Sequence, residues 1–133
     1  MIHSLKPGPI VLGFVVDTVA TVLFGLAYAA LTIMREGVPD DSTPEIVMTT
    51  GDYGVFAVVG LSFVAAGGFV AARKAGIRPV AHGACVGLAS LALTLVLELL
   101  AHDASEPLWF TVLSVGGIVP AGALGGLLWR MVS

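Results

Sequence analysis

Residues 79–101 read PVAHGACVGLASLALTLVLELLA, and the one charged side chain among them is Glu98. A helix needs about 20 largely apolar residues to cross the hydrocarbon core of a bilayer, and Pro79 suits the first turn of such a helix. The chain holds three further stretches of this kind. The sequence therefore predicts an all-α, polytopic membrane protein. We expect a bundle of four transmembrane helices in a single domain over residues 1–133, with helices at about 9–34, 53–72, 79–101 and 108–129 and an outer loop at 35–52.

The composition excludes an ordinary water-soluble domain. Of the 133 residues, 57% are hydrophobic and 11% are charged, whereas a soluble domain has roughly 25% charged residues. The six Lys and Arg residues form no basic patch, so nucleic acid is not expected as a partner. Cys85 is the one cysteine, which excludes an intrachain disulfide and a cysteine-based metal site. We expect the lipid bilayer as a partner, and no cofactor.

The charges of the short loops predict how the helices are oriented. Lys6, the link of residues 73–78 and Arg130 lie at one end of the expected bundle, whereas the loops at the other end are mainly acidic. Arg35 is the one cationic residue at the acidic end. Cytoplasmic loops of membrane proteins carry an excess of Lys and Arg. We therefore expect both the N- and the C-terminus to be cytoplasmic.

The chain shows signs of an internal repeat. Pro9 and Gly13 open the first predicted helix with the same spacing as Pro79 and Gly83 in the third. The second and fourth helices both close on a Gly-Gly pair followed by an arginine. Two related hairpins in tandem would give this pattern, as in transporters built from parallel repeats. Chance likeness between glycine-rich membrane helices would give it too, so both interpretations stand.

The link between the second and third helices carries two motifs, GGFVAAR at residues 67–73 and HGACVGL at residues 82–88. In these motifs, and in residues 13–17 and 120–126, the chain resembles a family of short, uncharacterised four-helix bacterial inner-membrane proteins. In that family GG-(Y/F)-V-A-A-R is followed by HGA-x-VG. The resemblance covers most of the chain except the acidic loops. It implies a four-helix topology and a multi-pass location in the bacterial inner (cytoplasmic) membrane, and it implies no activity.

Asp17 is the residue that points most directly to a function. It lies about eight residues into the first predicted helix, hence roughly 12 Å along it, where a carboxylate costs about 2.5–3 kcal/mol on insertion scales. Gly13, Asp17, Thr21 and Gly25 recur every four residues and share one helix face. One interpretation is a carboxylate that couples to a proton or cation. The other is a structural hydrogen bond, or a pair with His82.

Glu98 is a second candidate intramembrane acid. It follows Ser90 and Thr94 along one face of the third predicted helix. Together with His102, Asp103 and Glu106 it could bind a cation near the outer end. However, Glu98 and His102 at i, i+4 give only two ligands, so a solvated helix end is the simpler interpretation. We predict no metal site.

Glycines at helix contacts are the feature with the clearest physical meaning. Small residues four apart let helix backbones approach closely in a membrane. The chain has such spacing in the third and fourth helices, and glycines on the Asp17 face of the first. The predicted helix-packing glycines are Gly13, Gly25, Gly83, Gly87, Gly122 and Gly126. Their contacts could lie within one chain or between chains.

Two functions from different classes remain. The chain has no nucleophile–base constellation and no phosphate-binding loop, so we do not expect an enzyme. The first hypothesis is a structural or accessory membrane protein that associates through its glycine faces, as a homo-oligomer or within a larger membrane complex. The alternative is a small ion- or proton-coupled transporter or channel that uses Asp17. Because four helices are few for a permeation path, that alternative predicts an oligomer.

Overall fold

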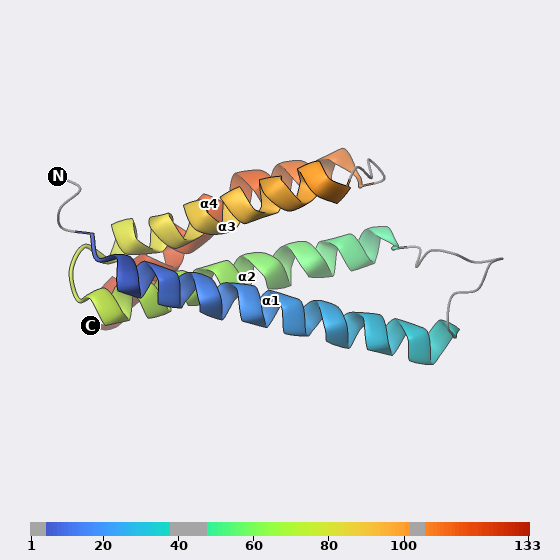
Figure 1. Cartoon of the computed structure of the whole chain (residues 1–133), viewed down its shortest axis with the longest axis horizontal. Coiled ribbons are helices and arrows are strands. Elements are labelled where there is room, and N and C mark those ends of the chain that lie inside the picture. Colours follow the sequence, from blue (N-terminus) through green and yellow to red (C-terminus); the bar gives the residue numbers. More distant parts are fainter. Residues whose placement is uncertain (1–4, 38–47, 102–105) are drawn as a thin grey trace.

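The computed structural model describes residues 5–37, 48–101 and 106–133, and within them it consists of four helices (Figure 1). The helices are α1 (Pro7–Glu36), α2 (Thr50–Ala75), α3 (Pro79–Ala101) and α4 (Leu108–Val132). Each is long and apolar enough to cross a membrane. The all-α, four-helix prediction is thus confirmed. The bounds predicted for α3 match those of the structure. Helices α1 and α2 extend two or three residues further at both ends, and α4 extends three residues further at its C-terminal end. Residues 38–47 of the predicted outer loop lie outside the described ranges.

Local hydrogen bonds explain why α2 begins before its apolar stretch. The Thr49 hydroxyl accepts from the backbone N–H of Asp52 at 3.3 Å, and the Asp52 carboxylate accepts from the backbone N–H of Thr49 at 2.7 Å. This reciprocal capping box satisfies N–H groups that have no partner within the helix. At the other end of α2, Gly76 adopts the left-handed conformation at φ +68° and donates to Ala72 O.

The cap at Thr49 gives a first stability prediction. Thr49→Ala should lower the free energy of unfolding by about 1 kcal/mol, because the Asp52 amide loses its acceptor. Equilibrium unfolding in mixed micelles, followed by circular dichroism, measures this change. Thr50→Ala, one residue into the helix, is the matched control and should have little effect. Equal losses in both variants would contradict the capping role.

The four helices run up and down, so the bundle has two chemically different ends (Figure 1). The start of α1, the α2–α3 link and the end of α4 lie together. We call this the basic end, because it carries Lys6, residues 73–78 and Arg130. The opposite, acidic end carries Glu36, Asp52, Glu98 and Glu106.

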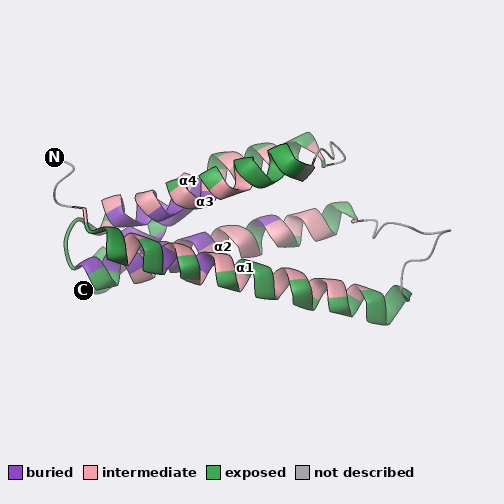
Figure 2. Cartoon of the chain, viewed as in Figure 1, coloured by how far each residue is buried: buried purple, intermediate pink, exposed green. Residues whose placement is uncertain are grey.

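The helices pack unevenly along their length. Helices α2 and α3 each contact all three others, whereas α1 and α4 share no contact among the described residues. Most of the buried residues are small, and most lie in the basic half of the bundle (Figure 2). Toward the acidic end the α3–α4 pair diverges from α1 and α2 (Figure 1), and the outward faces of the helices carry large apolar side chains suited to lipid.

Glycine backbones make the tight contacts of the basic half. A Cβ added to Gly13 would meet Gly67 O, and one added to Gly122 would meet Gly83 O. Thus a pair of glycines forms the close contact between α1 and α2, and another pair forms the close contact between α3 and α4. Gly68 also lies against the backbone of Gly122, which ties α2 to α4.

Not every predicted packing glycine lies at such a contact. Gly87 lies against Ile118 and Val119, and Gly126 against Pro79. At Gly25, in contrast, an added Cβ would meet no atom within 4 Å. Gly25 lies about three turns beyond Gly13, toward the acidic end, where the helix pairs diverge. Its spacing from Gly13 therefore did not suffice to predict a helix contact.

Candidate functional site

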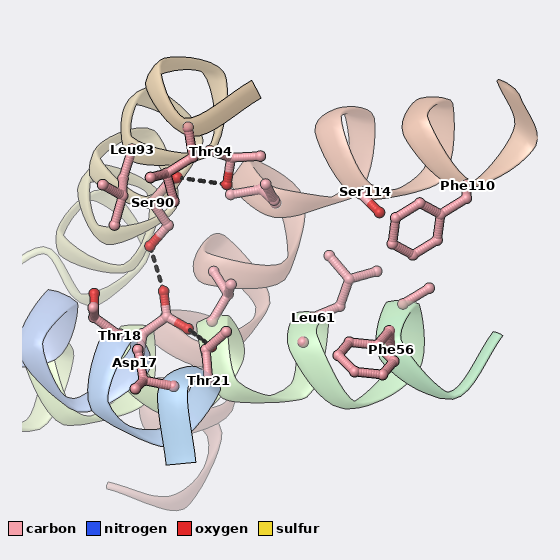
Figure 3. A pocket seen from close by; sticks show the side chains of 16 residues that line it. Asp17, Thr18, Thr21, Phe56, Leu61, Ser90, Leu93, Thr94, Phe110 and Ser114 are labelled. Atoms are coloured by element: carbon pink, nitrogen blue, oxygen red, sulfur yellow. Dashed lines mark hydrogen bonds between the residues drawn. The ribbon is translucent and has the colours of Figure 1, made fainter. Parts of the chain in front are cut away.

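Asp17 is buried inside the bundle, with 4% of its surface exposed. The Ser90 hydroxyl of α3 donates to its Oδ2, and the Thr21 hydroxyl donates to its Oδ1 at 3.5 Å (Figure 3). Close approach of the helices creates this position. The Gly13–Gly67 contact lies one turn away, and a Cβ on Gly67 would come within 3.1 Å of the Asp17 Cβ.

The pairing of Asp17 with His82 that the sequence allowed does not occur. His82 is fully buried, and its Nε2 accepts from the Lys6 backbone N–H at 3.1 Å. Its Nδ1 lies 3.0 Å from Arg78 O, to which the neutral imidazole donates. Val86 lies on α3 between His82 and Ser90, against Gly13 of α1. Ser90 rather than His82 therefore faces Asp17, about two helical turns further along α3.

The hydrogen-bond partners of the Asp17 carboxylate are thus neutral hydroxyls. An ionised carboxylate away from water is costly unless a cation or several donors compensate its charge. Two hydroxyl donors compensate it only in part.

A cavity of about 290 Å³ lies beside Asp17 and is lined by residues of all four helices (Figure 3). Helices α1, α3 and α4 contribute its polar groups, whereas α2 contributes apolar side chains such as Phe56 and Leu61. From Asp17 the lining continues toward the acidic end, as far as Leu97 and Phe110. The polar lining residues are Asp17, Thr18, Thr21, Ser90, Thr94 and Ser114.

On its other side Asp17 borders the closely packed basic half. Beyond the glycine contacts, Lys6 joins three elements at the basic end: its backbone N–H bonds His82 of α3, and its Nζ donates to Ala75 O of α2 at 3.1 Å. Arg73 of α2 lies over the Trp129 ring of α4, 5.8 Å from its centroid. The basic half therefore packs closely on this side of the cavity.

Glu98 does not take part in this site. It lies exposed near the acidic end of α3 and is not among the residues that line the cavity. Partial desolvation of the Glu106 carboxyl, and secondly the nearby charge of Glu98, raise the pKa of Glu106 above its ordinary value. His102 and Asp103 lie outside the described residues. Within those residues, no group of three or more His, Cys, Asp or Glu side chains could hold a metal ion.

Several lining residues were not identified from the sequence. Ser90 and Thr21 lay on the polar faces that the spacing marked, so a signal for them existed. Thr18, Ser114, Phe56 and Phe110 gave no such signal, because they look like ordinary residues of apolar helices. Only the packing of the four helices brings them to one cavity.

Comparisons with known proteins add no relative. No protein-family model matches the chain, and neither the curated proteins nor the solved structures give a match. The fold and the site by themselves define a class: a four-helix bundle compatible with a multi-pass membrane protein, with a buried acid beside an internal cavity.

Proposed function

We propose that this chain is a small multi-pass membrane transporter in which Asp17 binds and releases a proton or another cation. The observation that carries the proposal is the position of Asp17: buried, bonded by neutral hydroxyls, and beside a cavity that all four helices line. Ionisable residues inside membrane proteins commonly mark the paths of ions and protons.

The charges of the two ends suggest the direction of access. The cavity extends from Asp17 toward the acidic end of the bundle, where acidic residues raise the local concentration of cations. The basic end, by the positive-inside rule, is placed in the cytoplasm. On this proposal the cavity faces away from the cytoplasm. The resemblance noted in the sequence adds the bacterial inner membrane as the proposed location.

The accessory role receives less support from the geometry. Gly13, Gly83, Gly87, Gly122 and Gly126 pack against helices of their own chain, so they present no free face to a partner. A partner would have to use other surfaces, such as the open side of α1 at Gly25. The cavity is complete within one chain, so binding at Asp17 needs no second copy.

Proton flux into proteoliposomes tests the proposed function. Purified protein is reconstituted with a pH-sensitive dye inside the vesicles, and a potassium diffusion potential drives proton entry. Asp17→Asn keeps the shape of the side chain and removes its titration, and it should lose the flux. Glu98→Gln removes an exposed acid outside the cavity and should keep it. Equal flux in wild type and Asp17→Asn, or none in wild type above protein-free vesicles, would overturn the proposal.

A further inference from the structure

Two hydroxyl groups in the cavity wall have no partner within the described part of the chain. The Thr18 Oγ1 and Ser114 Oγ atoms are buried, and neither forms a hydrogen bond with a described residue. Other helical hydroxyls here do bond their own backbone: Thr32, Ser62 and Thr94 each donate to the carbonyl four residues back. Buried polar groups are almost always hydrogen-bonded. Both side chains line the cavity, so a turn about the Cα–Cβ bond would bring either hydroxyl to a solute bound there.

The rest of the wall fits an apolar body. Figure 3 shows Asp17 and Thr18 on one side of the cavity and Phe56 and Phe110 on the other. Aromatic rings pack favourably against apolar and other aromatic groups. The cavity thus places a carboxylate and a free hydroxyl at one end and aromatic rings at the other.

From this arrangement we propose that the cavity binds an organic ammonium ion, with its ammonium group at Asp17 and its apolar or aromatic body between Phe56 and Phe110. This inference rests on the proposed function, since it names the solute that competes with the proton at Asp17. An ammonium group carries N–H donors that the Asp17 carboxylate and the Thr18 hydroxyl can accept. Its charge also supplies the compensation that the neutral donors of Asp17 do not give.

The cavity, at about 290 Å³, is far larger than a single water needs and has room for a solute of about ten non-hydrogen atoms. An inorganic cation would leave the apolar walls without contacts. A lipid chain would leave the carboxylate and both hydroxyls without partners.

Equilibrium binding of 2-phenylethylammonium tests the inference, with the uncharged 2-phenylethanol as its match in size. Titration calorimetry on the purified full chain in detergent micelles, at neutral pH, gives both affinities. The ammonium should bind wild type about tenfold tighter or more than the alcohol, as one charge-assisted contact requires. In Asp17→Asn this difference should disappear.

Thr18→Val separates a binding role from a structural one. Replacing a hydroxyl that has no partner by a methyl group of the same shape should leave the thermal stability unchanged or higher. The same change should weaken ammonium binding several-fold, by about the worth of one hydrogen bond to a charged group. Thr32→Val, on the same helix but outside the cavity, is the control and should leave binding unchanged.

The outcomes separate the two proposals. If the alcohol binds as tightly as the ammonium, or if neither binds, the organic ammonium is excluded as the solute. Flux that depends on Asp17 would then still support the proposed transport of protons or small cations. Binding that depends on Asp17 without any flux would instead support the site and overturn transport.

Discussion

Gly122→Ala is expected to lower the free energy of unfolding by about 3 kcal/mol or more, at the upper end of the usual cost of overpacking. The added methyl group would meet Gly83 O, with Gly87 N only 2.9 Å away. These are backbone atoms of a facing helix, which cannot turn aside as a flexible side chain can. Helices α3 and α4 must therefore separate along the length of the contact.

Gly116→Ala is the matched control on the same helix. At Gly116 an added Cβ would meet no atom within 4 Å. Because alanine is favoured over glycine inside a helix by about 0.5–1 kcal/mol, this variant should be as stable as wild type or slightly more so. Equilibrium unfolding in mixed micelles compares the two. Equal stability of Gly122→Ala and Gly116→Ala would show that the close packing of α4 is wrong.

Asp17→Asn is expected to reduce proton flux about tenfold or more, as intramembrane proton-coupling acids do when neutralised. The asparagine Oδ1 can still accept from Ser90, so the fold should remain intact. Because no charge is then buried, the variant should be at least as stable as wild type.

A loss of flux without a loss of stability would distinguish a functional role of Asp17 from a structural one. Flux is measured in proteoliposomes, and stability is measured on the same preparation by thermal unfolding in micelles. A purely structural Asp17 predicts the reverse pattern, with lower stability in the variant and no loss of flux beyond that caused by unfolding. A trade-off of activity against stability is common where a charged group is kept for function.

The four helices could be predicted from the sequence because their signal is simple. Apolar length located all four, and Pro79 marked the first residue of α3, whose bounds matched; α1 begins at Pro7, two residues before the predicted start at Pro9. The start of α2 was missed by three residues, since the Thr49–Asp52 cap is polar and lies outside the apolar stretch. Asp17 could also be identified, because a carboxylate at that depth is costly wherever it points.

The partner of Asp17 could not be predicted, for a physical reason. His82 and Ser90 lie on the same face of α3, so the choice between them depends on the offset of α1 along α3. That offset is set by the contact of Gly13 with Val86 and Gly67. In the same way, Thr18 and Ser114 are ordinary residues in the sequence, and only tertiary packing leaves their hydroxyls without a partner.

Access to the cavity from each side of the membrane tests the central claim most directly, namely that Asp17 is reached from the acidic end and closed off from the basic end. A cysteine is introduced in the cavity wall by Thr94→Cys, at a partly exposed residue, in a Cys85→Ser background and in sealed vesicles of known orientation. Glu98→Cys and Ser133→Cys calibrate the acidic and basic ends. A membrane-impermeant thiol reagent should label the Thr94→Cys protein only when added from the side that labels the Glu98→Cys protein. Labelling only from the side of Ser133, or from neither side, would contradict the account.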